Sequence, residues 1–497
     1  MKNQVQLIAY ADRLGGTLHG IRELLRGPLA GVFGGVHLLP FFHPIDGADA
    51  GFDPIDHTEV DSRLGNWADV GDIAREADVM ADVIVNHISS RSPQFLDFSA
   101  KGTDSAYAGM FLTLDGVFPH GATERDLLAI YRPRPGLPLS PMTLADGSRR
   151  ILWTTFTTEQ LDIDVRHPRG IEYLENILRI FAANGVRMVR LDAVGYAVKK
   201  AGTSCFMLDE TFDFIREFSA RAKRLGLEVL VEIHSHYARQ IEIARHVDWV
   251  YDFALPPLVL HAFFNSTARH LKRWIGIRPA NSLTVLDTHD GIGVIDVGAD
   301  SQDRAGRSGL VPESELTRLV EQIHTNSKGE SLRATGAAAA NLDLYQVNCT
   351  YYDALGRDDY RYLLSRAVQF FLPGVPQVYY VGLLAGTNDT QLLARTRVGR
   401  DINRHHYSRG EIDQALEQPV VRRLLELIRL RNSHSAFSGS FEMADSVDEV
   451  LDLRWRNGAE FARLHLDLRT CAHRLEFSDA GRTRSLDLTT RGTHAHA

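Results

Sequence analysis

The chain has 497 residues, of which 44% are hydrophobic and 24% are charged, a balance typical of a globular protein that can bury a large core. The formal net charge is −8 and no cluster of Lys and Arg stands out, which argues against nucleic acid as a partner. No run of about 18 apolar residues is present to span a bilayer, and the first residues lack the apolar core of a signal peptide. We therefore expect a cytoplasmic protein with neither a membrane nor a nucleic-acid partner.

Short apolar runs alternate with amphipathic stretches along most of the chain, a pattern that predicts repeated βα units around a parallel sheet. We expect strands, in chain order, at Val5–Ala9, Val36–Leu39, Val83–Asn86, Val186–Asp192, Val229–Glu232, Val250–Phe253, Leu283–Asp287 and Val375–Tyr380. About this number of strands forms a TIM (β/α)8 barrel. Most of the runs are continuously apolar, as buried parallel strands are.

Two helices between these strands have a clear period. Apolar residues recur at spacings of three and four over 171–181, and Gly185 follows them. The same spacing recurs over 214–225, where Gly226 is the stop signal. Two successive units of helix, glycine and strand argue against an all-α or an all-β fold and favour an α/β barrel.

Two long stretches interrupt this alternation, and the pattern changes again near the end of the chain. Long loops without structure are uncommon in compact domains, so we interpret the two stretches as subdomains inserted above the barrel. Short alternating runs after residue 435 predict a small C-terminal antiparallel β domain. The expected limits are 1–85, 168–291 and 356–434 for the catalytic barrel, 86–167 for an inserted B subdomain, 292–355 for an inserted B′ subdomain and 435–497 for the β domain.

Cysteine and histidine spacing gives no sign of a disulfide framework or a metal site. Cys205, Cys349 and Cys471 are odd in number and far apart, and they lack the spacing of metal ligands. The histidines do not form a His-Glu-x-x-His pattern. We therefore expect no metal and no organic cofactor.

Several of the expected strands end in ionisable or polar side chains, which meet at one face of a barrel. These strand ends carry Asn86 and His87, then Asp192, then Glu232 and His234, and finally His289 and Asp290. A single carboxylate at such a place is more often a helix N-cap, and a lone His is more often structural. Several together are costly to bury unless a function retains them. Paired carboxylates suit glycosyl transfer, in which one attacks the anomeric carbon and the other donates and later accepts a proton.

Four segments resemble the signature regions of glycoside hydrolase family 13, the α-amylase family, and they occur in the right order: 82–87, 190–196, 232–234 and 287–290. Five more resemble the sucrose phosphorylase subgroup of that family: 10–14, 46–57, 131–136, 341–348 and 399–404. The resemblance extends from residue 1 to about 435 and weakens in the C-terminal β domain.

The resemblance implies a role for each matching residue. Asp192 would be the nucleophile, Glu232 the general acid and base, and Asp290 the group that stabilises the transition state. Arg190 stands two residues before Asp192 on the same face of a strand, where its charge favours the ionised carboxylate. The residues that would bind the donor sugar or the acceptor are Asp49, Phe52, His87, Phe156, Gln160, Tyr196, His234, His289, Asp343, Gln346 and Arg400.

Two further residues distinguish phosphorolysis from hydrolysis. Arg134 lies in a Pro-flanked loop, and a planar guanidinium binds phosphate oxygens in a fork. Tyr345 would donate a further hydrogen bond in the acceptor loop of the B′ subdomain. Considered alone, Arg134 would be a solvated loop charge and Tyr345 a packing residue. Together with the carboxylates they indicate a phosphate site.

The expected reaction is therefore a double displacement through a β-glucosyl-enzyme. Sucrose and inorganic phosphate would be the substrates, and α-D-glucose 1-phosphate and D-fructose the products. Relatives that act on sucrose 6-phosphate, glucosylglycerol or glucosylglycerate would share the carboxylates and differ in the acceptor loops. A sucrose or α-glucoside hydrolase leaves the phosphate-suited loop unexplained, and a barrel used only for binding would lack one of the carboxylates. The resemblance also implies a homodimer.

Overall fold

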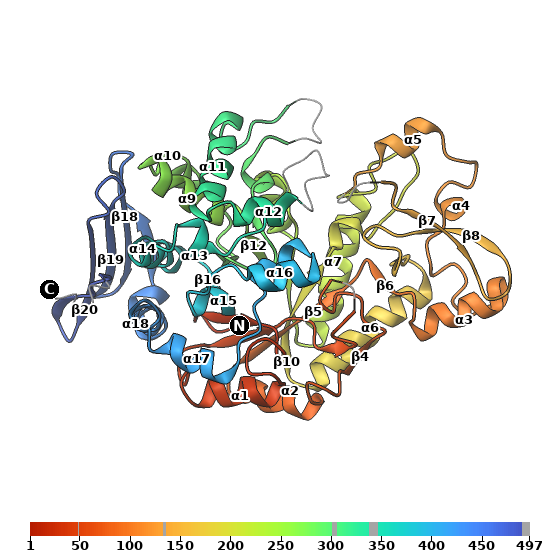
Figure 1. Cartoon of the computed structure of the whole chain (residues 1–497), viewed down its shortest axis with the longest axis horizontal. Coiled ribbons are helices and arrows are strands. Elements are labelled where there is room, and N and C mark those ends of the chain that lie inside the picture. The colour runs from red at the N-terminus through yellow and green to blue at the C-terminus, as the bar shows by residue number, and fades with distance from the viewer. Residues whose placement is uncertain (48, 133–135, 301–305, 337–345, 490–497) are drawn as a thin grey trace.

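The computed structural model describes residues 1–489 except 48, 133–135, 301–305 and 337–345 (Figure 1). Its centre is a closed barrel of parallel strands in the order β1-β16-β13-β12-β11-β10-β5-β2. These strands are β1 (Gln6–Ala9), β2 (Gly35–Leu38), β5 (Asp78–Ile84), β10 (Val186–Asp192), β11 (Glu228–Val231), β12 (Trp249–Asp252), β13 (Ser282–Thr284) and β16 (Val375–Tyr379). The prediction of a TIM barrel is confirmed, because each expected run overlaps one of these strands.

One strand differs clearly from its expected limits. β5 begins at Asp78, five residues before the expected start at Val83, because Asp78 and Asp82 interrupt the apolar run that indicated the strand. Asp82 is nevertheless fully buried, since His37 on β2 and Arg190 on β10 both contact its carboxylate. A charged residue therefore lies inside this strand because its partners come from the two neighbouring strands.

Helices cover the outside of the barrel. They are α1 (Leu18–Arg26), α2 (Trp67–Ala74), α6 (Pro168–Ala183), α7 (Asp209–Arg224), α8 (Tyr237–Ile243), α9 (Leu255–Asn265), α10 (Arg269–Ile277), α14 (Asp359–Phe371) and α18 (Pro419–Ser433). The helices expected over 171–181 and 214–225 are confirmed as α6 and α7. α6 starts with Pro at its first position and buries its apolar face, and Gly185 beyond its end has a φ of +86° that favours glycine.

The first interruption of the βα alternation forms a separate small layer. It holds β6 (His87–Ser89), α3 (Pro93–Lys101), α4 (Leu114–Val117), α5 (Glu124–Ala129), β7 (Leu139–Thr143), β8 (Arg149–Trp153) and β9 (Gln160–Asp162). β6 pairs antiparallel with β9, and β7 with β8. Several of its apolar residues, with Cys205, form a cluster apart from the main core. Figure 1 shows this part extending to the right of the barrel.

The second interruption lies between β13 and β16. Its described elements are β14 (Ile292–Gly293), α11 (Glu313–Asn326), α12 (Glu330–Gly336), β15 (Gln346–Val347) and α13 (Tyr351–Ala354). β14 and β15 pair antiparallel, with Gly293 opposite Gln346. This pairing brings the end of the insertion back to the segment that follows β13. The exact limits expected for both insertions remain predictions.

A five-stranded antiparallel sheet closes the described chain and confirms the expected β architecture there. Its strands are β17 (Ser440–Met443), β18 (Val450–Asn457), β19 (Glu460–Asp467), β20 (His473–Asp479) and β21 (Arg482–Ser485). Trp455 on β18 donates a hydrogen bond of 2.7 Å to the carbonyl oxygen of Phe371 at the end of α14. The sheet is therefore attached to the barrel through α14, beside which it lies in Figure 1.

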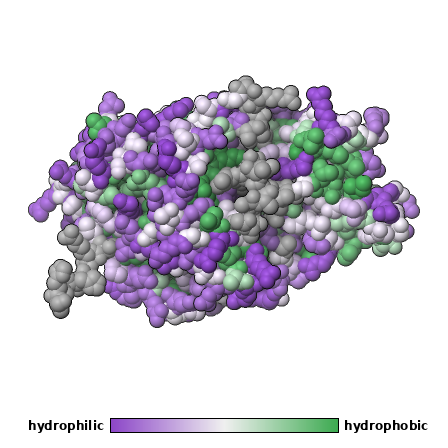
Figure 2. All heavy atoms as spheres, turned by 45° about the horizontal axis from the view of Figure 1, so that its top comes forward, coloured by the Kyte–Doolittle hydropathy of each residue, from purple (hydrophilic) through white to green (hydrophobic). Residues whose placement is uncertain are grey.

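The surface is largely hydrophilic on the face that Figure 2 shows. Hydrophobic groups gather over the right-hand part of this face, where the first insertion lies. That insertion carries four large apolar side chains that are exposed: Leu96, Leu128, Leu137 and Ile151. Among the helices of the described residues, none has the length and apolar character needed to cross a membrane.

Candidate active site

The side chains expected to carry the chemistry meet in one pocket. Asp192 ends β10, Glu232 follows β11 directly, and Asp290 lies in the loop after β13, so all three belong to the carboxyl-terminal face of the barrel. The pocket encloses about 690 Å³ including space open to solvent, within the range of small-molecule sites. Its walls are Asp49, Phe52, His87, Phe156, Gln160, Asp192, Ala193, Tyr196, Glu232, His234, His289, Asp290, Gln346 and Arg400.

All predicted site residues that the structure describes therefore line the pocket, except Arg190, which is buried beside it. They come from the barrel, from both insertions and from the loop near residue 400. Arg134, Asp343 and Tyr345 lie outside the described residues, so the phosphate-binding residues stay a prediction. Ala193 is the one wall residue that the sequence did not indicate.

A buried ion-pair network supports Asp192. Arg190 donates from Nη1 to Oδ1 of Asp192 at 2.8 Å and to Oδ1 of Asp82 at 2.6 Å. The other oxygen of Asp82 lies 3.0 Å from Nε2 of His37. Burial opposes the charge of Arg190, but Asp82 and Asp192 raise its pKa well above the ordinary value. The guanidinium is thus permanently charged and holds the Asp192 carboxylate in one orientation.

Two influences on the pKa of Asp192 oppose each other. Burial, the larger one, raises the pKa, and the nearby negative charges of Glu232 and Asp82 act in the same direction. Arg190 lowers the pKa but does not outweigh them. Asp192 therefore has a pKa above the ordinary value of an aspartate.

Glu232 lies beside His234, whose ring is held by a hydrogen bond to Asp296. Oε2 of Glu232 accepts from the Ala193 amide at 3.4 Å, and Oε1 lies 3.8 Å from Nε2 of His234. Nδ1 of His234 lies 3.0 Å from Oδ2 of the fully buried Asp296. Although burial disfavours the imidazolium, Asp296 and Glu232 raise the pKa of His234. The imidazole ring also stacks on Phe253 with 3.9 Å between ring centroids.

Asp290 is surrounded by positive charge. Arg400 Nη1 lies 2.9 Å from Oδ1 of Asp290 and 3.5 Å from Oδ2 of Asp49. Burial alone would raise the pKa of Asp290, but the charge of Arg400 lowers it below the usual range. Arg404 supports this group, because its Nη1 lies 3.6 Å from Asp49 and its Nε donates to the His289 carbonyl oxygen at 3.0 Å. Asp290 is therefore ionised at neutral pH and faces the pocket as a fixed negative charge.

Aromatic rings line the pocket beside the polar groups. The ring of Phe52 stacks on His289, with centroids 5.0 Å apart and an interplanar angle of 11°. The carbonyl oxygen of Phe52 lies 3.0 Å from Nε2 of His87 and accepts from Gln160 at 3.3 Å. Phe156 meets His87 edge to face, at 5.3 Å between ring centroids. Such a surface suits the apolar face of a sugar ring, while burial lowers the pKa of His289 to about 3 and keeps it neutral.

The pocket also contains a group of atoms that resembles a metal site. The ligand-type atoms of Glu232, His234 and Asp290 lie within 4.8 Å of one another. Asp290 is paired with Arg400, and His234 with Asp296. A cation would have to compete with the guanidinium and displace these pairs. The arrangement fits acid–base chemistry at a polar substrate better than it fits ion binding.

Three supporting residues were not recognised as part of the site from the sequence. Asp82 and Arg404 lie inside two of the segments that resemble the family. A charged residue within or beside an apolar run could have indicated that each supports the site. Asp296 had no such signal. Its role depends on His234, which is 62 residues earlier in the chain.

No family model matches the chain. It is 61% identical over 465 residues to a sucrose phosphorylase of Agrobacterium vitis, covering 93% of this chain and 95% of that protein. It is 54% identical over 498 residues to a sucrose phosphorylase of Bifidobacterium adolescentis, with 98% of each chain covered. The chain belongs to the sucrose phosphorylase family.

A solved structure supports the same family at the level of the fold. The crystal structure of a sucrose 6F-phosphate phosphorylase from Thermoanaerobacter thermosaccharolyticum superposes with a TM-score of 0.89 at 38% identity, covering 98% of this chain and 97% of that one. The sucrose phosphorylase family is a branch of glycoside hydrolase family 13, so the resemblance of the signature segments is confirmed.

Proposed function

We propose that the protein is a sucrose phosphorylase, which transfers the glucosyl group of sucrose to inorganic phosphate with retention of configuration. The products are α-D-glucose 1-phosphate and D-fructose, and the reaction is reversible. The observation that carries this proposal is the meeting of Asp192, Glu232 and Asp290 in one pocket of a chain that belongs to this family. The pocket supplies a nucleophile, a proton donor and a fixed negative charge.

The first displacement forms a covalent β-glucosyl-enzyme. The ionised carboxylate of Asp192 attacks the anomeric carbon while the bond from that carbon to the fructose oxygen breaks. Glu232 gives its proton to the departing oxygen, so fructose leaves neutral. Asp192 and Glu232 must therefore hold one proton between them before reaction. Arg190, which donates to Asp192 at 2.8 Å and lowers its pKa, favours the ionised form of Asp192, so Glu232 is the group that carries the proton.

The second displacement transfers the glucosyl group to phosphate. A phosphate oxygen attacks the anomeric carbon from the side that fructose left, and the bond to Asp192 breaks. Glu232, now a carboxylate, accepts the proton of the attacking phosphate hydroxyl. Two inversions in succession give net retention. Asp290, ionised and held by Arg400, stabilises the positive charge that develops on the sugar in both steps.

The donor site is assigned by the same reasoning. Asp49 and Arg400 present a carboxylate and a guanidinium to the pocket, and we assign them to the sugar hydroxyls together with His87 and His289. Phe52 would contact the apolar face of the glucose ring. Phe156, Gln160, Tyr196, His234 and Gln346 line the remainder of the pocket and are assigned, with Asp343, to substrate contacts on the acceptor side.

Phosphate specificity rests on Arg134 and Tyr345 in this proposal. A hydrolase of the same fold would use water in the second displacement and would not need an anion site.

We further propose that the protein works in the cytoplasm as a homodimer. Cys205, Cys349 and Cys471 are free, which fits a reducing compartment. The exposed apolar side chains of the first insertion offer a surface for a second copy.

The function is tested by incubating the protein with sucrose, with and without inorganic phosphate, and measuring glucose 1-phosphate, glucose and fructose. We expect glucose 1-phosphate to appear only with phosphate and in an amount equal to that of fructose. Free glucose in equal amounts under both conditions would show a hydrolase. If sucrose is not converted but sucrose 6-phosphate, glucosylglycerol or glucosylglycerate is, the protein is a phosphorylase of that substrate instead.

A further inference from the structure

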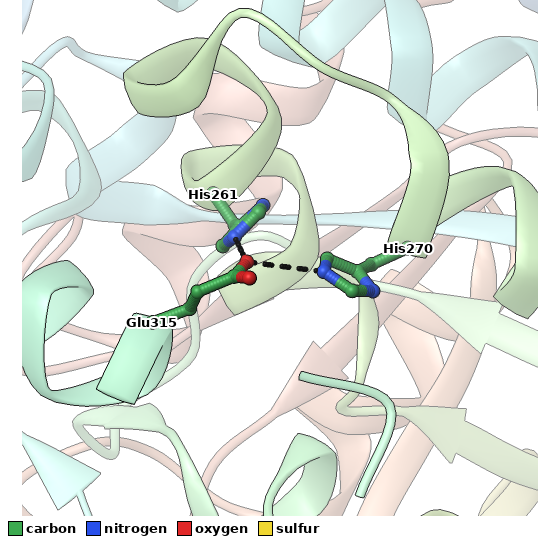
Figure 3. Close-up of side chains that lie close together, drawn as sticks. All are labelled: His261, His270 and Glu315. Atoms are coloured by element: carbon green, nitrogen blue, oxygen red, sulfur yellow. Dashed lines mark hydrogen bonds and ion pairs between the residues drawn. The ribbon is translucent and has the colours of Figure 1, made fainter. Parts of the chain in front are cut away.

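Two histidines and a glutamate meet where α9, α10 and α11 pack together, outside the active-site pocket. Figure 3 shows His261 on α9, His270 on α10 and Glu315 on α11 with their side chains turned toward one another. Nε2 of His261 lies 2.8 Å from Oε2 of Glu315, and Nε2 of His270 lies 3.1 Å from the same oxygen. None of the three lines the active-site pocket, so the cluster needs an explanation of its own.

The donor set is one that zinc prefers. Two imidazole nitrogens and one carboxylate oxygen are the protein ligands of many zinc sites, where water or a further ligand completes a tetrahedron. With bonds of about 2.0–2.2 Å, tetrahedral ligand atoms are roughly 3.3 Å apart. The three ligand atoms here all lie within 4.8 Å of one another, and the two nitrogen–oxygen distances are only a few tenths of an ångström shorter. Small side-chain rotations would open the space for an ion.

Burial and charge also suit a divalent cation. The side chains of His261, His270 and Glu315 are 1%, 10% and 21% exposed, so the cluster is largely buried and Glu315 retains some access to solvent. Oε2 of Glu315 lies within 3.1 Å of both imidazole nitrogens, so two neutral ligands and one anionic ligand are already gathered around one point.

Arg269, the cationic side chain paired with Glu315, is weakly placed. Nη2 of Arg269 lies 3.9 Å from Oε1 of Glu315, and the Arg269 side chain is 61% exposed. It faces the oxygen that the histidines do not contact, and an exposed pair of this kind contributes little. Arg269 can therefore move into solvent when an ion binds.

We propose that His261, His270 and Glu315 form a binding site for a zinc-like divalent metal ion that joins the start of α11 to α9 and α10. α11 begins the helical part of the second insertion, which leads to the acceptor loop. A metal ion here would fix that insertion to the helices of the barrel without entering the active site. Its expected effect is on stability, because metal that binds the folded state alone raises the unfolding temperature.

The test uses the full chain after removal of metal with a chelator. Calorimetric titration with zinc chloride should show one ion bound per chain, and zinc should raise the unfolding temperature. His270→Gln and Glu315→Gln should lose this binding and this rise. The control is His19→Gln, which removes an exposed histidine paired with Glu23 on α1 at 3.3 Å and should bind zinc as the native chain does. Circular dichroism without metal checks that each variant folds.

X-ray absorption of the zinc-loaded chain gives a second, independent readout. The proposed site contributes two imidazoles to the ion, whereas the active-site group of Glu232, His234 and Asp290 contributes one. The spectrum is recorded on a chain with His494→Gln, His496→Gln and His406→Gln, which removes two closely spaced histidine pairs of the sequence. Two imidazoles in that chain support the proposal. Absence of one-to-one binding, binding unchanged in both variants, or a spectrum with a single imidazole would overturn it.

Discussion

The chemistry of individual residues in this pocket depends on buried charged side chains that contact them and do not face the substrate. Asp192 is oriented by Arg190, which in turn contacts Asp82. His234, next to Glu232, is fixed by Asp296. Asp192 and His234 thus each have a buried partner of opposite charge, Arg190 and Asp296, and two of the predictions below follow from removing that partner.

Asp192→Asn removes the proposed nucleophile while keeping the shape of the side chain. We expect kcat for sucrose phosphorolysis to fall by at least about 10³-fold, because an amide cannot form the glucosyl-enzyme. Steady-state assays of glucose 1-phosphate release measure this loss. The far-UV circular dichroism should not change. Activity within tenfold of the native enzyme would remove Asp192 from its proposed role.

Arg190 should control the acid side of the pH profile. Because Arg190 lowers the pKa of Asp192, its loss in Arg190→Gln raises that pKa further. The nucleophile is then protonated up to a higher pH, so the acid limb of kcat/KM should move to higher pH. Arg190→Lys retains the charge and serves as the control, with a smaller displacement. An acid limb that is identical in native enzyme and Arg190→Gln would contradict this assignment.

Asp296→Asn should change the titration of His234 without touching the substrate. The carboxylate of Asp296 stabilises the charged imidazole, so its replacement should lower the pKa of His234. NMR titration of the imidazole resonances measures this directly. We also expect kcat/KM to fall by roughly tenfold, a typical effect for a partner behind a functional histidine. An unchanged His234 titration in a folded variant would show that Asp296 acts only on packing.

At the scale of the elements, pairs of segments hold the walls of the pocket at fixed positions. β6 and β9 pair antiparallel, with His87 opposite Asp162. Lys199, in the loop after β10, contacts the end of β9 and the residue before β6, because its Nζ lies 2.5 Å from Oδ2 of Asp162 and donates to Asn86 Oδ1 at 2.6 Å. The side chains of Lys199 and Asp162 are almost completely inaccessible. This ion pair therefore connects the barrel to its first insertion at the residue that pairs with His87.

Lys199→Met should destabilise the protein strongly, since it leaves Asp162 charged and buried without its partner. The expected loss in the free energy of unfolding is about 3–5 kcal/mol, measured by urea denaturation. The double variant Lys199→Met/Asp162→Asn should recover part of this loss, because no unpaired charge remains. A double variant less stable than Lys199→Met would mean that the hydrogen bonds of Asp162 matter more than its charge.

At the scale of the whole molecule, the barrel is central and the added parts lie at its edges (Figure 1). The first insertion carries Leu96, Leu128, Leu137 and Ile151 as exposed large apolar side chains. Exposed apolar groups that gather on one part of a surface are typical of interfaces. The proposed homodimer would bury this part of the molecule against a second copy.

Sedimentation should therefore give twice the chain mass of 55.5 kDa for the native protein. Leu128→Glu, at a side chain that is 68% exposed, should weaken the dimer, because a charge would have to be buried in the interface. Val447→Glu is the matched control, since Val447 is 67% exposed in the C-terminal part of the chain. A monomeric native protein, or equal behaviour of both variants, would refute an interface at the first insertion.

Much of the barrel and of the candidate site could be predicted from the sequence because the signals are local. A buried parallel strand is a short apolar run, so all eight barrel strands could be recognised, although β5 was expected to begin too late. In a parallel barrel every strand points the same way, so side chains that follow different strands meet at one face. This rule alone brings Asp192, Glu232 and Asp290 together, whatever the exact packing.

Only the tertiary structure decided which buried groups pair with one another. Arg190 and Asp82 are 108 residues apart in the chain, and His234 and Asp296 are 62 apart. The sequence likewise indicated no metal site, yet His261 and Glu315, 54 residues apart, contact each other across two helices. No local pattern encodes such pairs, because their distance is set by how helices and strands pack around the barrel. The sequence determined the fold and indicated the carboxylates proposed to react, and packing determined the charges that support them.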